Sequence, residues 1–145
     1  MISDYDSVVD DISKPKIKKA QLKANEIWIN FCDKKMPISL NDIIQKMGIH
    51  VKEENLSIDG ITRTDENGLC VILYNRNISV ERKRFTVAHE IGHIVLEHTS
   101  IFGDCDQFSK NSQEKEANAF AGELLVPSDD LKNYVKKQSL KLKIL

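Results

Sequence analysis

Apolar residues recur at helical spacing in the first part of the chain. Between residues 16 and 33 they repeat every three or four positions, with lysines on the other face, which predicts a helix. A second, short helix is predicted at 40–47, because Ser39 is a favourable N-cap and Gly48 favours a helix end. Residues 1–14 are polar and acidic, and we interpret them as a lead-in.

The pattern then changes to the period of a strand. Residues 49–53, 58–63 and 69–74 read as three strands, and Gly60 in the second strand suggests a bulge. The segment Asp-Glu-Asn-Gly at 65–68 is a strong turn signal between the last two strands. We therefore expect a small, mostly antiparallel sheet of three strands.

The last part of the chain returns to helical spacing. A long helix is predicted at 80–97, followed by a polar loop at 98–111 and another helix at 112–125. A short final helix is predicted to begin at Ser128 and to run into a lysine-rich tail at 136–145. About five helices with one small sheet indicate the α+β class.

Size and composition exclude several classes of protein. The 145 residues suit a single domain over 1–145, and 41% apolar with 30% charged residues is ordinary for a globular protein. A net charge of -1 gives no electrostatic argument for direct nucleic-acid binding, and no apolar run could span a membrane. The N-terminus lacks the features of a signal peptide. Cys32, Cys70 and Cys105 are widely spaced and odd in number, which favours a reducing cytoplasm.

The helix predicted at 80–97 contains the pattern H-E-x-x-H. His89 and His93 lie four residues apart and share one helix face, so that both can bind one metal ion, with Glu90 beside the metal as a base. The helix is apolar nearly all round, which predicts that it is buried. Burying two histidines and a glutamate without partners is costly, and a metal ion with a water molecule would satisfy all three. The alternative is a chance match on an amphipathic helix.

A third ligand is expected from the helix at 112–125, since a catalytic zinc usually has three protein ligands. One stripe of this helix carries a carboxylate, an amide and small residues that let a neighbouring helix approach. Its members are Glu114, Ala117, Asn118, Ala121 and Leu125. We favour Glu114 as the ligand over Glu116, because Glu116 and Glu123 are predicted to point toward solvent. The amide oxygen of Asn118 is predicted to accept a hydrogen bond from the free N–H of a ligand histidine and so to orient its ring. His98 is expected on the opposite side of its helix or off its end, as a surface residue.

Two imidazoles and one carboxylate suit Zn²⁺, although Mn²⁺, Co²⁺ or Fe²⁺ could occupy the same set. Zinc would make a water molecule more acidic, and Glu90 would take its proton before attack on a peptide carbonyl. Tyr74 is one candidate donor to the developing oxyanion. A weaker idea is that the Cys105 thiolate blocks the metal until it is oxidised.

Two motifs carry a family resemblance. R-F-T-V-A-H-E-I-G-H at 84–93 and E-K-E-A-N-A-F-A-G-E-L-L-V-P at 114–127 resemble the ImmA/IrrE family of bacterial metallopeptidases, over about residues 17–135. The resemblance implies a minimal, gluzincin-like zincin domain with the H-E-x-x-H helix at its centre. It also implies zinc bound by His89, His93 and Glu114, with Glu90 as the catalytic base. Family members are typically encoded by mobile elements or stress loci, and they often cleave a helix-turn-helix repressor encoded nearby.

We therefore expect a cytoplasmic zinc endopeptidase whose substrate is a specific protein. The expected substrate is such a repressor, bound in an extended form beside residues 69–74. The alternative is a regulator, in a toxin–antitoxin or repressor pair, that keeps the fold and binds a partner without cleaving it. A purely structural zinc has no use for Glu90 and usually has four protein ligands, which favours the peptidase.

Overall fold

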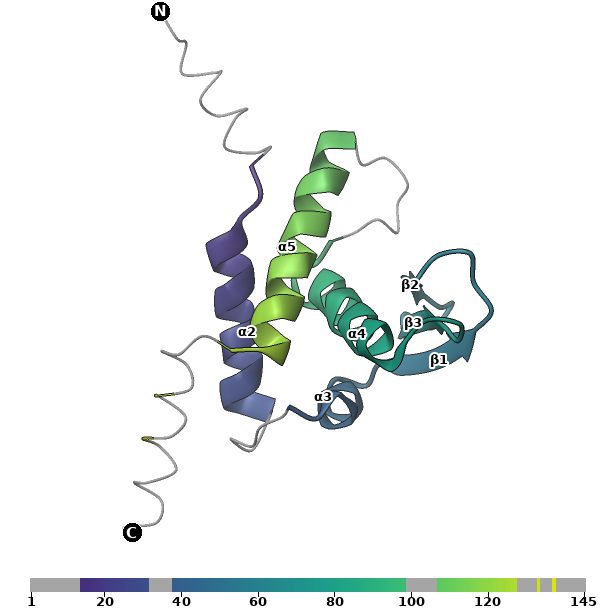
Figure 1. The fold of residues 1–145 in the computed structure, drawn as a ribbon, viewed down its shortest axis with the longest axis horizontal. Helices are drawn as coiled ribbons and strands as arrows, with labels where there is room; N and C mark the ends of the chain where they lie inside the picture. The colour runs from purple at the N-terminus through teal and green to yellow at the C-terminus, as the bar shows by residue number, and fades with distance from the viewer. Residues whose placement is uncertain (1–13, 32–37, 99–106, 128–132, 134–136, 138–145) are drawn as a thin grey trace, which may run out of the picture.

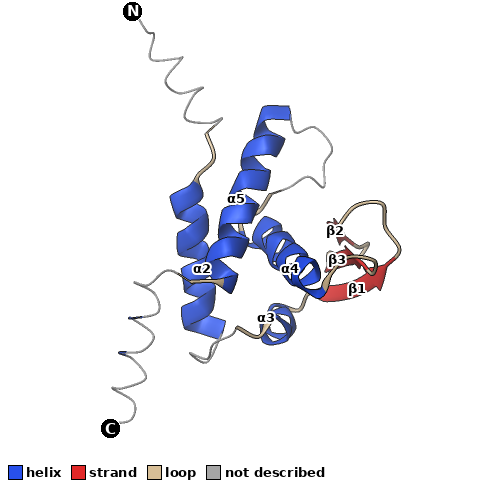
Figure 2. Ribbon diagram, viewed as in Figure 1, coloured by secondary structure: helices blue, strands red, loops and turns tan. Residues whose placement is uncertain are grey.

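The computed structural model describes residues 14–31, 38–98, 107–127, 133 and 137. Within them the chain forms four helices and a three-stranded sheet, which confirms the α+β class. The elements are α2 (Ile17–Phe31), α3 (Leu40–Met47), β1 (His50–Glu54), β2 (Gly60–Thr64), β3 (Cys70–Asn75), α4 (Val80–Val95) and α5 (Gln107–Leu125). Figure 1 shows α2 and α5 side by side, with α4 between α5 and the sheet. Figure 2 shows the strands gathered at one end of this arrangement.

The helix boundaries follow from local capping. The hydroxyl of Ser39 accepts a hydrogen bond from the backbone of Asp42, and Gly48 ends α3 in the left-handed conformation, so the predicted bounds of α3 are confirmed. Ser79 caps α4 in the same way as Ser39 caps α3. Helix α5 begins at residue 107 rather than at 112, and α4 ends at Val95 rather than at residue 97.

The sheet corrects the predicted topology. Its strand order is β1-β3-β2, with β1 parallel and β2 antiparallel to β3, so the sheet is mixed rather than mostly antiparallel. The turn at 65–68 does form a hairpin, and Gly68 has a φ of 79°. The prediction gave a turn signal only between the last two strands and took the sheet as mostly antiparallel. Instead, the chain from β1 passes through β2 before β3 returns between the two, which supplies the long connection that a parallel pair needs.

Gly60 is not a bulge, because it pairs in register with Tyr74 as part of the β2–β3 ladder. An added Cβ atom at Gly60 would lie 2.5 Å from the Cγ2 atom of Thr86 and 3.0 Å from the carbonyl oxygen of Leu73. The glycine therefore allows β2 to lie very close to α4.

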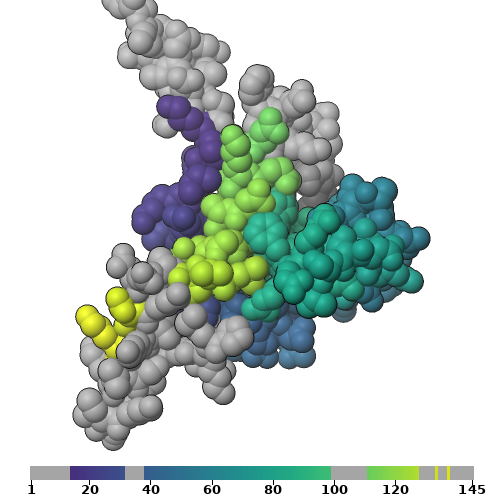
Figure 3. Space-filling view, in the orientation of Figure 1, coloured from purple at the N-terminus to yellow at the C-terminus, as the bar shows by residue number. Residues whose placement is uncertain are grey.

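The core is formed where α2, α4 and α5 meet and where α4 covers the sheet. Trp28 of α2 is 1% exposed, and its indole N–H donates a hydrogen bond to the carbonyl oxygen of Leu124, 2.8 Å away. Trp28 therefore packs in the core between α2 and α5. The other largest side chains that are fully buried are Phe120, Ile43, Ile72, Ile91 and Leu124. In the space-filling view, α5 lies between α2 and α4 (Figure 3).

Several predictions concern residues outside the described ranges. These are the lead-in before residue 14, the final helix from residue 128 with most of the lysine-rich tail, and the metal-blocking role of Cys105. Among the described helices, none has the length and apolar character needed to cross a membrane.

Candidate functional site

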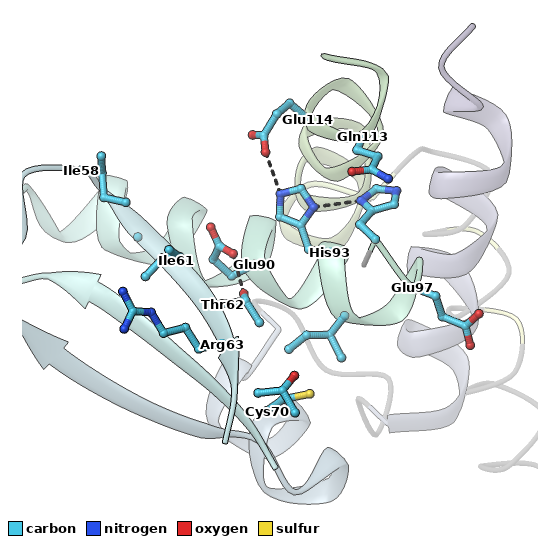
Figure 4. A pocket seen from close by; sticks show the side chains of 14 residues that line it. Ile58, Ile61, Thr62, Arg63, Cys70, Glu90, His93, Glu97, Gln113 and Glu114 are labelled. Carbon is cyan, nitrogen blue, oxygen red and sulfur yellow. Dashed lines mark hydrogen bonds and ion pairs between the residues drawn. The ribbon is translucent and has the colours of Figure 1, made fainter. Parts of the chain in front are cut away.

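The side chains of the H-E-x-x-H pattern lie at the junction of α4, α5 and β2. His89 and His93 project from α4 toward α5, and Glu114 of α5 contacts both of them. Figure 4 shows the pair formed by His93 and Glu114. The Nε2 atom of His89 lies 3.0 Å from Oε2 of Glu114, and the Nε2 atom of His93 lies 3.0 Å from Oε1. The two Nε2 atoms are themselves 3.0 Å apart.

This donor set fits a small divalent cation. Among the described residues, His89, His93 and Glu114 form a group of potential ligands whose donor atoms all lie within 4.8 Å of one another. A tetrahedral metal with bonds of about 2.0–2.1 Å would hold its ligand atoms about 3.3 Å apart, close to the spacing seen here. Two imidazoles and a carboxylate are also the ligand types that zinc prefers.

The hydrogen bonds around His89 strengthen this fit. Its Nδ1 atom lies 2.8 Å from Oδ1 of Asn118, an acceptor, so the Nδ1–H donates to the amide oxygen. The neutral ring then presents the lone pair of Nε2 to the carboxylate of Glu114, which is also an acceptor. Two acceptors 3.0 Å apart repel each other unless a proton or a metal ion lies between them.

The electrostatics of the site are consistent with a cation at this position. Burial by itself lowers the pKa of His89, but the hydrogen bond and the charge of Glu114, together with the charge of Glu90, raise it above its ordinary value. The imidazoles of His89 and His93 beside it hold the pKa of Glu114 well below its usual range. A positive charge is therefore favoured between the three side chains, whether a proton or a metal supplies it.

Small residues let α4 and α5 approach closely enough for this geometry. An added Cβ atom at Gly92 would lie 2.9 Å from the ring of Phe120, so the glycine of the motif is needed for the contact with α5. Ala88 on α4 and Ala117 and Ala121 on α5 are completely buried. The small-residue stripe predicted on α5 therefore faces α4.

Glu90 points from α4 toward β2. Its side chain is buried, and Oε2 accepts a hydrogen bond from the hydroxyl of Thr62 on β2 at 2.5 Å (Figure 4). Gly60 permits this contact, because its missing side chain lets β2 lie against Thr86 of α4. No pattern in the sequence singles out Thr62, since one threonine in a strand carries no motif.

His98 and Glu116 differ from their predicted positions. The side chain of His98 is 7% exposed rather than on the surface, and its Nδ1 atom lies 2.9 Å from Nδ1 of His93. The side chain of Glu116 is 15% exposed rather than solvated, and its Oε2 lies 2.8 Å from Nε2 of His98. Burial lowers the pKa of His98 despite its contact with Glu116, which favours the neutral imidazole.

The end of α4 explains why His98 was misplaced. Glu97 adopts the left-handed conformation with a φ of 57°, the N–H of His98 donates to the carbonyl oxygen of His93, and that of Glu97 donates to Ile94. This pair of hydrogen bonds is the Schellman motif, which brings the residue two past the helix cap back against the last turn. The usual signal for the motif is glycine, and glutamate stands in its place.

A cavity of about 850 Å³ opens beside these groups. Strand β2 forms one wall along its whole length, and Glu90, His93 and Glu114 lie at the opposite side (Figure 4). Apolar side chains contribute part of the lining, including Ile58, Ile61 and Ile94. Tyr74, a candidate oxyanion donor, is not among the lining residues, and its ring lies near the ammonium group of Lys83 instead.

Comparison with known proteins places the chain in a family. Residues 44–144 match the family described as the IrrE N-terminal-like domain, a family of peptidases. The chain belongs to this family. The match includes α4, α5 and the whole sheet, but it begins after α2, whereas the motifs suggested a resemblance from about residue 17. No curated protein matches the chain.

Proposed function

We propose that the chain is a zinc-dependent endopeptidase that acts on a specific protein. Family membership supports a peptidase, and the observation that carries the metal-dependent reaction is the meeting of His89, His93 and Glu114 beside a cavity that also contains Glu90. Three protein ligands leave a coordination position open, as in catalytic zinc sites and unlike most structural ones.

Each side chain has a distinct role in the proposed reaction. A zinc ion held by His89, His93 and Glu114 would supply a Lewis acid that polarises the peptide carbonyl and makes a water molecule more acidic. Glu90 accepts the proton of the attacking water and then donates it to the leaving amine. Asn118 holds the ring of His89 in the orientation that the metal requires, and Thr62 holds the carboxylate of Glu90 toward the cavity.

The substrate would bind in an extended form along β2. This strand lies at an edge of the sheet and lines the cavity, whereas β3, which includes most of the segment first considered for this role, is the central strand. An extended peptide can add to a free strand edge through backbone hydrogen bonds, and the cavity can accept its side chains. The wall of the cavity includes isoleucines, which favours an apolar side chain near the scissile bond.

The proposed substrate is a helix-turn-helix repressor of a mobile element or of a stress or toxin–antitoxin locus, as the motif resemblance suggests. The odd number of widely spaced cysteines supports a reaction in the cytoplasm. The alternative is a regulator that binds such a repressor without cleaving it.

The test is to map the new protein N-termini that proteolysis creates in host cells. Cells that express the wild-type protein are compared with cells that express Glu90→Gln, which preserves the size of the side chain but removes the base. We expect N-termini that appear only with the wild type, at one or a few sites in a single protein, and the same cut when that protein and the zinc-loaded wild type are mixed. Capture of a partner without any new N-terminus would favour the non-cleaving regulator. Equal cleavage by Glu90→Gln would exclude the proposed mechanism.

A further inference from the structure

The Nδ1 side of the His93 ring is held by a partly buried series of hydrogen bonds. Nδ1 of His93 lies 2.9 Å from Nδ1 of His98, and Nε2 of His98 lies 2.8 Å from Oε2 of Glu116. The other carboxylate oxygen of Glu116 accepts a hydrogen bond from the backbone N–H of Lys16, 2.8 Å away at the start of α2. These hydrogen bonds therefore connect a candidate metal ligand to the start of a helix that lies outside the range matched by the family.

The donor and the acceptor of each hydrogen bond between these side chains follow from the chemistry of Glu116. The carboxylate of Glu116 can only accept, so Nε2 of His98 must carry the proton that it receives. A neutral His98 then has a lone pair on Nδ1, and Nδ1 of His93 must be the donor to it. This leaves the lone pair of His93 on Nε2, the atom that faces Glu114 and the Nε2 atom of His89.

We propose that His98 and Glu116 are positioning residues that fix the tautomer and the ring orientation of His93 for metal binding. The proposal rests on the metal site of the proposed function. Ligand histidines usually donate their second N–H directly to a carboxylate or a carbonyl, and these partners set both the tautomer and the basicity of the ligand. Here a second imidazole stands between the ligand and the carboxylate.

The backbone places these hydrogen-bonded side chains next to one another directly. The Schellman motif at the end of α4 places His98 against His93, and Glu116 lies two residues past Glu114 on the helix that supplies the third ligand. The side chains of His93, His98 and Glu116 are all at most 15% exposed. The series of hydrogen bonds behind His89 is shorter, because it stops at the exposed side chain of Asn118.

Zinc affinity separates this role from simple packing. The affinity of the full chain is measured by competition with a chromophoric chelator for the wild type, His98→Leu, His98→Gln and His50→Leu. Leucine fills the space but cannot form hydrogen bonds, whereas the amide of glutamine can accept from His93 and donate to Glu116. His50 is an exposed histidine on β1 and serves as the control.

We expect His98→Leu to weaken zinc binding by roughly 10–100-fold, the usual effect of removing a partner of a ligand histidine. His98→Gln should recover most of this loss, and His50→Leu should bind zinc like the wild type. If His98 only fills space, the order is reversed, with leucine close to the wild type and glutamine weaker, and the proposal is wrong.

A second measurement does not depend on whether the variants fold. In the zinc-loaded wild type with ¹⁵N-labelled histidine, long-range ¹H–¹⁵N spectra report which ring nitrogen carries the proton. We expect the proton on Nε2 of His98 and on Nδ1 of His93. A proton on Nδ1 of His98 would overturn the proposal. A wild-type protein that takes up no zinc would overturn the proposed function as well, whereas normal uptake by both the wild type and His98→Leu would overturn the positioning role alone.

Discussion

The face of α4 that packs on α5 and the face that packs on the sheet are held in place differently. Toward α5, His89 and His93 each have a hydrogen-bonded partner behind the ring, and small residues bring the two helices together. Toward the sheet, the carboxylate of Glu90 accepts a hydrogen bond from the hydroxyl of Thr62, and Gly60 lets β2 lie close enough to supply it. Under the proposed function, metal affinity would therefore depend on α5, and the orientation of the base would depend on β2.

The largest effect is expected from removing the ligand on α5. Glu114→Ala should lower zinc affinity by at least about 100-fold, more than the loss expected for a partner behind a ligand. Zinc at 100 times the wild-type dissociation constant should stabilise the wild type by about 2.7 kcal/mol, and the same concentration should stabilise the variant by only about 0.4 kcal/mol or less. Thermal unfolding with and without zinc measures both. Glu123→Ala on the same helix is the control, and an equal loss of stabilisation there would contradict a specific role of Glu114.

A change on the sheet side should affect the reaction and not the metal. Thr62→Val keeps the shape but removes the hydroxyl that holds Glu90, and we expect kcat to fall on the order of 10-fold to 100-fold with zinc affinity unchanged. Thr62→Ser retains the hydroxyl and should cleave nearly as well as the wild type. The measurement is the rate of cleavage of the substrate found by N-terminal mapping. Weaker zinc binding by Thr62→Val would remove the distinction between the two faces.

Two glycines test the close contact between the helices. Gly92→Ala would place a methyl group 2.9 Å from the Phe120 ring, and overpacking of this kind costs about 1–3 kcal/mol. At Gly122 an added Cβ atom meets nothing within 4 Å, so Gly122→Ala should stabilise α5 by about 0.5–1 kcal/mol. Chemical denaturation of the two variants should therefore shift in opposite directions. Equal stability of both would show that the helices can move apart at no cost.

The smallest effect concerns a surface contact between α4 and the sheet. The hydrogen bond from Lys83 lowers the pKa of Glu53, with smaller contributions from the charges of Lys83 and Arg76. Because the pKa is lowered in the folded state, the pair stabilises the protein at neutral pH and loses this contribution as the pH falls through that pKa. Lys83→Met should raise the pKa of Glu53 toward its ordinary value in an NMR titration, and Arg76→Gln should raise it less. The reverse order would contradict the direct contact.

The features that were predictable from the sequence are those that depend on residues within one helix or one turn. Helix α3 has a capping serine and a terminal glycine, and the turn at 65–68 has its own residue signal, so both were predicted correctly. The periodicity of α4 and α5 was sufficient to predict that the carboxylate of Glu114 lies toward the two histidines. Such features depend on residues fewer than ten positions apart, or on the facing sides of two helices.

The features that were missed depend on contacts between distant elements or on a local change of direction. The parallel pairing of β1 and β3 depends on where β2 lies, which periodicity does not reveal. Thr62 matters only because β2 meets α4. His98 was placed by counting turns of a continuing helix, but the left-handed Glu97 ends that helix first. Glu116 was assigned to solvent because it lies off the small-residue stripe of its helix, and this position does not reveal its contact with His98.

The hydrogen bond from the indole of Trp28 to the carbonyl oxygen of Leu124 has a practical consequence for where the fold begins. Helix α2 precedes the range shared with the family, yet it covers α5 and supplies the N–H group that holds Glu116. A fragment trimmed to residues 44–144 would present the buried side of α5 to water and should aggregate rather than behave as a working enzyme. Expression boundaries for this protein should therefore be drawn upstream of Lys16, whatever the sequence profile of its relatives suggests.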